Sequence, residues 1–447
     1  MNLNKINNFL LFLLAAYVPF VDTFHIFLFK ILVFKYLYIC LIVYYLIFIV
    51  LTRKKIVLNK VGNVSLFLIL FFISQLISGL FANDTDLALQ KVYAEFQFLV
   101  IFIIVNKMFI DNNSYEYVLK GFLVGFLVSF VIAMLQKNGV KGFYLFSEEE
   151  LNQNTGLMGV MKGNKNAIIR IWGPFGNSLG FAEYLSTVGI ILYSYYRMIK
   201  RSSIKSILIL VITIYCIILT VSRTSLFALI LSLLIIEIIY ARLNNSNLPV
   251  YMISFFILIS IAFLFLKPAA DGIPLMKRFS NAGNDFKTAR LNLWIKGYQA
   301  FSKNIFFGVG PGNLRGALSS EGFPMTSVLI SQFEGQHVEN YFLTVLYTYG
   351  IIGFYFCMMI YYYTISYSYL LFKFFRKQVK SFAYGGLFFG AIIVLMINNI
   401  TIPIFEERIK LLVIIVFASI NNSYLFFYKL GFFNINYFKK TIEKITE

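Results

Sequence analysis

Long runs of apolar residues alternate with short polar segments along almost the whole chain. Runs of about 18 or more residues can cross the hydrocarbon core of a bilayer as helices. The pattern predicts an all-α, polytopic integral membrane protein with about twelve transmembrane helices, forming a single domain over residues 1–447. The predicted spans lie at residues 9–24, 32–51, 62–81, 92–109, 117–136, 178–196, 204–221, 224–241, 250–267, 340–363, 382–402 and 410–428.

The composition agrees with a protein that lies in lipid. Only 13% of the residues are charged, whereas a soluble domain averages about 25%, and the mean hydropathy is +0.77. In a soluble protein the net charge of +19 would suggest a nucleic-acid partner. Here the basic residues gather in alternate loops, which indicates orientation in a membrane. No nucleic-acid partner is therefore expected.

The distribution of basic residues also predicts which loops face which side. Clusters at residues 53–60, 197–205, 373–380 and 439–444 all fall on one side if both termini are cytoplasmic. This topology leaves two long extracytoplasmic loops, at residues 137–177 and 268–337. The second lies between the ninth and tenth spans and is the predicted catalytic loop. Met1 to Phe20 is expected to stay as an uncleaved first span.

The chain offers few ligands for a metal ion. Cys40, Cys216 and Cys357 all lie inside apolar runs, with no spacing typical of a disulfide or metal site. Asp84-Thr-Asp86 is a pattern that can hold a metal, but two acids before a span are more often helix caps. We favour the capping interpretation.

The loop at 268–337 holds a dense group of candidate functional residues. Residues 285–304 are helical in pattern, and Arg290 and Trp294 lie one turn apart on the same face. A plainer interpretation of that pair is an arginine that snorkels beside a packed tryptophan. The glycine run from Gly308 to Gly312 predicts a sharp turn, which we favour over an anion-binding nest.

Three further positions at the same predicted side of the membrane carry polar chemistry. His337 and Asn340 stand where the long loop re-enters the tenth span, and a neutral imidazole there suits a general base. A polar anchor is the simpler alternative for His337. Arg223 lies in a turn of about three residues between two spans, where a charge needs a partner. Its predicted extracytoplasmic position runs against the positive-inside trend, which favours a functional role.

Together these motifs resemble the bacterial O-antigen ligase and O-antigen polymerase superfamily, over residues from about 170 to 360. One similar motif is the Arg170…Gly173…Asn177 approach to a span, and another is the Ser222-Arg223-Thr224 turn. The signature stretch comprises Arg290-x3-Trp294, Gly308-Val-Gly310-Pro-Gly312-Asn313, His337-x2-Asn340-Tyr-x-Leu343 and Tyr349-Gly350-Ile-Ile-Gly353. The chain departs from the family at His337-Val-Glu-Asn340, where many members have His-Asn directly, and the role of Asn340 stays open.

The resemblance implies a GT-C-like membrane glycosyltransferase of the bacterial cytoplasmic (inner) membrane, with its active site facing the periplasm or exterior. Such proteins take a glycan from undecaprenyl diphosphate and pass it to a sugar hydroxyl. Polymerases extend O-antigen or capsule chains, whereas ligases attach the finished chain to lipid A–core in lipopolysaccharide. The aromatic-rich and Lys/Ile/Asn-rich composition suits a strain-specific polysaccharide locus, so we expect a polymerase, with a ligase as the alternative.

A third interpretation is a flippase or transporter for lipid-linked oligosaccharides. Such a protein should gather its charges and broken helices at mid-membrane, whereas here they gather at one predicted surface. The expected partners are therefore the undecaprenyl-diphosphate-linked oligosaccharide and the lipid bilayer. A flippase and a chain-length regulator of the same pathway are candidate protein partners.

The resemblance also implies roles for individual residues. His337 would be the general base on the acceptor hydroxyl, in a reaction that inverts the anomeric carbon. Arg223 and Arg290 would stabilise the departing diphosphate, because guanidinium groups bind phosphate oxygens in a fork. With arginines in that role, no metal and no cofactor are expected. The predicted substrate-binding residues are Arg170, Arg278, Trp172, Trp294, Asn177, Gly310 and Asn340, with the tryptophans stacking on sugars.

Overall fold

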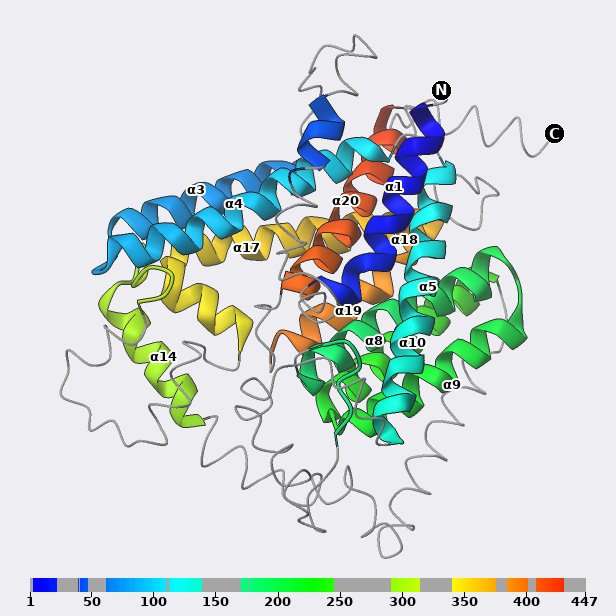
Figure 1. Ribbon diagram of the computed structural model, residues 1–447. Coiled ribbons are helices and arrows are strands. Elements are labelled where there is room, and N and C mark those ends of the chain that lie inside the picture. Colours follow the sequence, from blue (N-terminus) through cyan, green and yellow to red (C-terminus); the bar gives the residue numbers. More distant parts are fainter. Residues whose placement is uncertain are drawn as a thin grey trace, which may run out of the picture.

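The structure is a computed structural model in which every described element is a helix (Figure 1). It describes residues 3–21, 39, 41–46, 62–109, 112–138, 170–175, 177–244, 291–313, 340–374, 384–400 and 407–429. Within these residues, 7 helices are long and apolar enough to cross a membrane. The all-α, polytopic membrane class is therefore confirmed. The count of about twelve spans and the bounds of the loops at 137–177 and 268–337 stay predictions.

The long helices each overlap a predicted span. They are α3 (Asn63–Leu80), α4 (Thr85–Met108), α5 (Asn112–Lys137), α9 (Ser203–Thr220), α10 (Arg223–Asn244), α17 (Tyr341–Phe374) and α20 (Glu407–Lys429). Of these, α4 begins earlier and α17 ends later than predicted. Shorter elements are α1 (Leu3–Tyr17) with the 3-10 turn η1 (Val18–Phe20), α8 (Ser178–Ser194) with the π-helix η4 (Tyr195–Ile199), α14 (Leu291–Lys303), α18 (Tyr384–Leu387) and α19 (Phe389–Asn398). The predicted span at 32–51 lies largely, and that at 250–267 entirely, outside the described residues.

The helices pack in groups that share one buried core. α1 packs on α5, α3 packs between α4 and α17, and α8 packs against α9, α10 and α19. α8 is the most enclosed, because every residue from Gly180 to Ser194 is buried. Small residues allow close approach between neighbours. At Gly121 of α5, a Cβ atom would lie only 2.3 Å from the carbonyl oxygen of Phe12 in α1.

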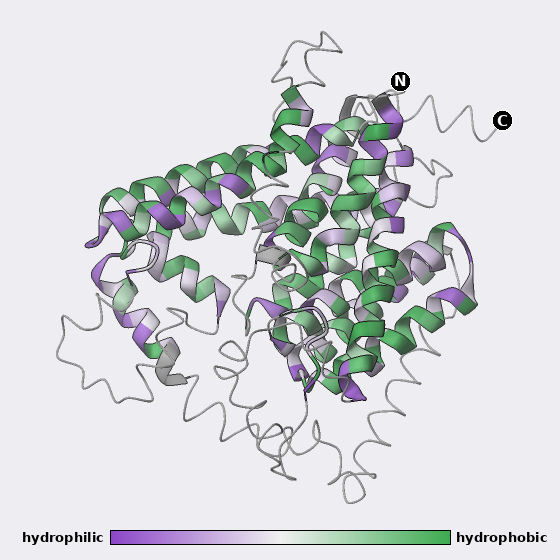
Figure 2. Ribbon diagram, in the orientation of Figure 1, coloured by the Kyte–Doolittle hydropathy of each residue, from purple (hydrophilic) through white to green (hydrophobic). Residues whose placement is uncertain are grey.

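The outside of the bundle is apolar, as a lipid environment requires. Figure 2 shows hydrophobic residues along most of the length of the helices, with hydrophilic residues more common near the helix ends. α9 is a clear case, since Ile204 is 82% exposed and Ile207, Leu208 and Val211 are also exposed. Large apolar patches are rare on soluble monomers. These side chains therefore indicate a face in contact with lipid.

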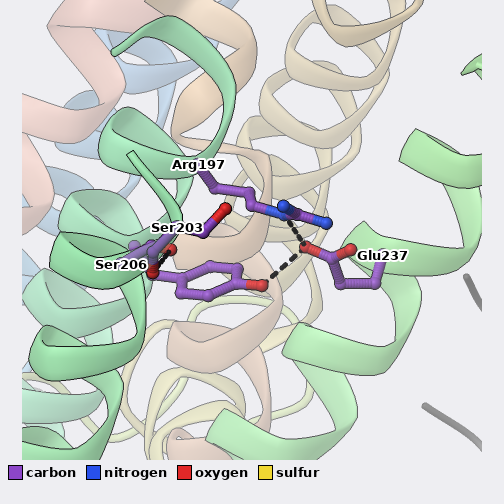
Figure 3. Close-up of polar contacts among 5 residues, drawn as sticks. Arg197, Ser203, Ser206 and Glu237 are labelled. Carbon is purple, nitrogen blue, oxygen red and sulfur yellow. Dashed lines mark hydrogen bonds and ion pairs between the residues drawn. The ribbon is translucent and has the colours of Figure 1, made fainter. Parts of the chain in front are cut away.

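A buried ion pair ties α10 to the end of α8. Glu237 of α10 is 1% exposed, and its Oε1 lies 3.4 Å from Nε of Arg197 in η4 (Figure 3). The hydroxyl of Tyr193, in the last turn of α8, donates to the same oxygen at 2.6 Å. A carboxylate inside a membrane bundle is costly unless it is paired. These contacts therefore fix α10 against α8 at the end of the bundle opposite Arg223.

Candidate active site

The turn that carries Arg223 forms the centre of the described site. α9 ends at Thr220, and Val221 then adopts a left-handed backbone conformation with φ of 60°. A β-branched residue rarely takes this conformation, which costs of order 1–3 kcal/mol. The turn leaves Ser222 2% exposed and Arg223 half-buried at the start of α10. Strain of this kind clusters at functional sites, in keeping with the role predicted for Arg223.

A chain of buried polar side chains runs from this turn across three helices. Ser222 Oγ donates to Ser225 Oγ at 3.1 Å, and Ser225 Oγ donates to Asn398 Oδ1 of α19 at 3.1 Å. Asn398 Nδ2 donates to Ser186 Oγ of α8 at 3.3 Å. All four residues are buried, where hydrogen-bond networks favour a single arrangement. We call this set the polar chain; it fixes the start of α10 against α8 and α19.

A buried carboxylate adjoins the polar chain. Glu183 lies on α8 one turn before Ser186, whose Oγ donates to the Glu183 carbonyl at 3.0 Å. The Glu183 side chain is fully buried. An ionisable group inside a membrane bundle is a functional candidate by default. No role was predicted for Glu183, Ser186, Ser225 or Asn398 from the sequence, where their only signal is that they are polar residues within apolar runs.

The segment that carries Arg170 lies beside the same turn. The N–H of Ile171 donates to the carbonyl of Leu219 at 3.3 Å. Leu219 precedes Arg223 by four residues, so Arg170, predicted to bind substrate, and Arg223 stand on adjacent segments. Both Arg170 and Arg223 are half-buried. Two guanidinium groups on adjacent segments give this end of the bundle a local positive charge that suits an anionic ligand.

Gln136 of α5 holds this segment in place. Its Nε2 donates to the Gly173 carbonyl at 2.6 Å, and its Oε1 accepts from the Gly173 N–H at 2.9 Å. Gly173 has φ of 54°, and a Cβ there would lie 2.6 Å from the ring of Phe181, so the position needs glycine. Trp172 is 4% exposed and packs within the bundle. Asn177 caps α8 by accepting a backbone N–H of its first turn at 2.6 Å.

The first turn of α17 connects to the polar chain through the end of α19. Asn340 caps α17 by accepting a backbone N–H at 3.0 Å. The N–H of Tyr341 donates to the carbonyl of Asn399 at 2.8 Å. Asn399 directly follows Asn398, so the start of α17 lies next to the polar chain. His337, three residues before Asn340, lies outside the described residues.

The glycine run forms a sharp turn against α17. Gly308, Gly310 and Gly312 have φ of 72°, 86° and 83°. The N–H groups of Val309 and Gly310 donate to carbonyl oxygens of α17 at 2.8 and 3.0 Å. These two donors are therefore engaged within the protein, as expected of a turn and not of an anion nest. The substrate contact predicted for Gly310 stays a prediction.

Asp84 acts as a helix cap, which confirms the interpretation favoured for the Asp84-Thr-Asp86 pattern. Its Oδ1 accepts from the Leu87 N–H at 3.0 Å at the start of α4. Its backbone N–H donates to Asn313 Oδ1 at 2.9 Å, which ties the glycine turn to α4. Among the residues that the structure describes, no three His, Cys, Asp or Glu side chains gather in a group that could hold a metal ion.

Of the remaining predicted site residues, some lie within the described part of the chain and others lie outside it. The helix expected at 285–304 is described from Leu291 to Lys303 as α14, which packs against α17 and carries the half-buried Trp294. Arg278 and Arg290, like His337, lie outside the described residues. Their predicted roles, and the sugar contacts predicted for Trp172 and Trp294, therefore stay predictions.

Part of the chain matches a known protein family. Residues 208–358 match the model of a family described as O-Antigen ligase. This segment covers about a third of the chain and includes Arg223, the glycine turn and the start of α17. The match confirms the resemblance to the O-antigen ligase and polymerase superfamily. No curated protein matches the chain.

Proposed function

We propose that the protein is a polysaccharide polymerase of the cytoplasmic membrane, because its residues 208–358 match the family model described as O-Antigen ligase. It transfers a glycan from undecaprenyl diphosphate to a sugar hydroxyl of a lipid-linked repeat unit of O-antigen or capsule. The reaction takes place on the outer face of that membrane, with both termini in the cytoplasm. The single observation that carries the proposal is the placement of Arg170 and Arg223 on adjacent segments beside the buried polar chain.

The chemistry explains why arginines suit this site. The bond between the anomeric carbon and the lipid diphosphate breaks, and negative charge gathers on the departing diphosphate. Arg223, Arg170 and the predicted Arg290 stabilise that charge through forked hydrogen bonds to phosphate oxygens. Stabilisation of developing charge by fixed donors is commonly the largest contribution to catalysis. This step uses side chains of the protein alone, so the proposed mechanism routes nothing through a metal.

His337 supplies the other half of the proposed reaction. It accepts the proton of the acceptor hydroxyl as the new bond forms to the anomeric carbon from the face opposite the diphosphate, so the configuration inverts. The position of His337 supports this role, because it precedes the cap of α17 by three residues. The cap adjoins Asn399, and Asn399 follows the Asn398 of the polar chain. This neighbourhood supports a site that the predicted base shares with Arg223 at one end of the bundle.

A ligase remains the second candidate, because the matched family is described as O-Antigen ligase. In that case the acceptor is lipid A–core, and the donor chemistry at Arg223 stays the same. Deletion of the gene separates the two functions. Single repeat units on the core indicate a lost polymerase, whereas long chains that never reach the core indicate a lost ligase. Repeat units trapped on the inner leaflet would contradict both and indicate a flippase.

Substitution of Arg223 tests the proposed mechanism. We expect Arg223→Ala to lower the transfer rate by about 100-fold or more, because a donor to the developing charge is lost. Arg223→Lys should recover only part of the rate, since an ammonium cannot form the fork. The measurement is the formation of polymer from a purified lipid-linked repeat unit by the protein in vesicles.

Arg242 is a matched control for this experiment. It lies in the last turn of the same helix and is exposed. Arg242→Ala should therefore leave polymer formation close to that of the wild type. Wild-type polymer yield with Arg223→Ala, at equal amounts of inserted protein, would remove Arg223 from the mechanism.

A further inference from the structure

A second group of cationic side chains lines a cavity beside α17, separate from the site around Arg223. The cavity has a volume of about 500 Å³ and lies among α3, α4, α17 and α20. Its polar lining includes Lys91 and Glu95 of α4, Lys410 of α20 and the buried Gln75 of α3. Aromatic side chains such as Phe98 line much of the remainder. An apolar wall with a few convergent polar groups is the usual form of a small-molecule site.

Lysines outnumber carboxylates among the charged groups that line the cavity. Lys91 and Glu95 are four residues apart on α4, so they share one face of the helix. Lys410 forms an ion pair with Glu95 and lies 5.1 Å from the centre of the Phe98 ring. The side chains of Lys410 and Glu95 are only 19% and 27% exposed. With two lysines and one carboxylate, these three groups leave a net positive charge beside apolar walls.

The first turn of α17 lies between this cavity and the polar chain. Tyr341 lines the cavity, and its N–H donates to the carbonyl of Asn399 at 2.8 Å. Tyr361, one of the deeper residues of the lining, accepts a hydrogen bond from Asn399 Nδ2 at 2.7 Å. Asn399 is adjacent to Asn398, which bonds to Ser225 near Arg223. A reacting group near the start of α17 would therefore have the arginine site around Arg223 on one side and the lysines of the cavity on the other.

We infer that this cavity binds the diphosphate and the first prenyl units of the accepting lipid-linked glycan, with Lys91 and Lys410 on its phosphate oxygens. The inference rests on the proposed function, because a polymerase joins two substrates that each carry a lipid diphosphate. The bond that forms joins the donor's anomeric carbon to the acceptor's hydroxyl oxygen, and the proton passes to His337. The donor's diphosphate leaves with its lipid at the arginines. The acceptor's diphosphate stays attached to its glycan in the cavity.

The two sites differ in the type of cation, with arginines at the donor's diphosphate and lysines at the acceptor's diphosphate, and this difference fits their proposed roles. Forked guanidinium groups suit the diphosphate whose charge grows during the reaction. Lysines act as point charges, which is sufficient for a diphosphate whose charge does not change. Lys91 and Lys410 are therefore positioning residues for the acceptor and take no part in bond breaking.

Counting bound prenyl diphosphates gives a test that needs no turnover. Farnesyl diphosphate is the probe, titrated against the full-length purified protein in detergent. We expect two molecules to bind per wild-type chain. Lys91→Gln/Lys410→Gln and Arg223→Ala should each remove one, and the two losses should concern different molecules. A single bound molecule in the wild type, or an unchanged count in the lysine variant, would overturn the inference.

Kinetics in vesicles provide a second test, with the concentration of each substrate varied while the other saturates. Lys91→Gln should raise the KM for the acceptor by about tenfold, because one charge-assisted contact is lost, with the KM for the donor and kcat nearly unchanged. Lys91 is exposed, so this variant should fold even if replacement of Lys410 disturbs the pairing with Glu95. Lys303→Gln, at an exposed lysine of α14, is the control. Equal changes in both KM values would contradict the assignment.

The same phosphate chemistry could come from a membrane phospholipid. Competition with phosphatidylglycerol distinguishes the two sources, because it carries a single phosphate. Farnesyl diphosphate should keep its second binding site in vesicles rich in phosphatidylglycerol. Complete displacement there would assign the cavity to an anionic phospholipid and overturn the inference. If two molecules of farnesyl diphosphate bind as expected and the wild type still makes no polymer, the proposed function fails while the cavity remains a prenyl diphosphate site.

Discussion

Asn398 shows how much of the described site depends on a single side chain. It accepts from Ser225 at 3.1 Å and donates to Ser186 at 3.3 Å, and so joins α19 to α10 and α8. Each lost partner leaves a buried polar group without its hydrogen bond, at a cost of about 1–3 kcal/mol. The asparagine thus acts on Arg223 indirectly, by fixing the start of the helix that carries it.

Replacement of Asn398 should distinguish an effect on the position of Arg223 from an effect on the stability of the protein. We expect Asn398→Ala to lower kcat by about tenfold, because the polar chain no longer fixes the start of α10. Glu237→Gln is the comparison, because it weakens a buried contact of the same helix at the far end. That variant should lower the melting temperature and leave kcat per folded molecule unchanged. An Asn398→Ala protein with normal kcat would show that the polar chain is only structural.

At the residue scale, the sequence predicted some positions and missed others for a physical reason. Arg223 stood out because a charge in a short turn between apolar runs is costly. Ser186 and Ser225 carry no charge, and small polar residues are common in membrane helices for packing alone. Only the fold brings them to Asn398, which lies 212 positions after Ser186 along the chain. Pairings over such a separation leave no local pattern.

α17 is the element on which the described parts of the site converge. Its backbone departs from helical geometry at Gly350, where φ is 66°, and the glycine turn packs into that kink. A Cβ at Gly308 would lie 2.3 Å from the carbonyl oxygen of Thr348, and one at Gly350 would lie 2.2 Å from that of Phe306. The two glycines therefore permit the close approach of two backbones.

The contact between these backbones gives a prediction about stability. Gly308→Ala should lower the free energy of unfolding by about 1–3 kcal/mol from its left-handed conformation alone, with a further loss from the clash. Gly79→Ala is the matched control, because its Cβ would meet only side-chain atoms and no backbone, the nearest being in Val92 at 3.3 Å. Thermal unfolding in detergent measures both. Equal melting temperatures for the two variants would show that the glycine turn yields without strain.

Element positions were the most predictable part of the structure. Apolar runs predicted the spans at 62–81 and 204–221 almost to the residue, since length and hydropathy decide whether a helix crosses a membrane. The same signal placed the predicted span at 92–109 too late, because α4 begins at Thr85. Its first turns carry charged residues such as Lys91, which line the cavity. Hydropathy does not detect polar residues that extend a helix beyond its apolar run.

At the scale of the whole molecule, the alternation of basic clusters predicts which end of the bundle faces the cytoplasm. Asp86 and Lys200 are both exposed and lie in segments assigned to opposite sides. The predicted active site requires His337 to share a side with Asp86. Helix packing alone does not decide this orientation, because the bundle is the same in either direction.

Cysteine labelling tests the orientation. In a background without Cys40, Cys216 and Cys357, we expect Asp86→Cys and His337→Cys to react with a membrane-impermeant maleimide on intact spheroplasts. Lys200→Cys should react only after the membrane is opened. Labelling of positions 86 and 337 from opposite sides would rule out a shared site, whatever the substrate.

The complete enclosure of α8 has a consequence for how the protein is made. Synthesis proceeds at about 5–20 residues per second, so roughly 10–40 s separate the emergence of Ser186 from that of Asn398. During that interval a helix that carries Glu183 has only some of its final neighbours. After its synthesis, α8 must therefore stay near the insertion machinery, or beside α9 and α10, until the last quarter of the polypeptide has been synthesised.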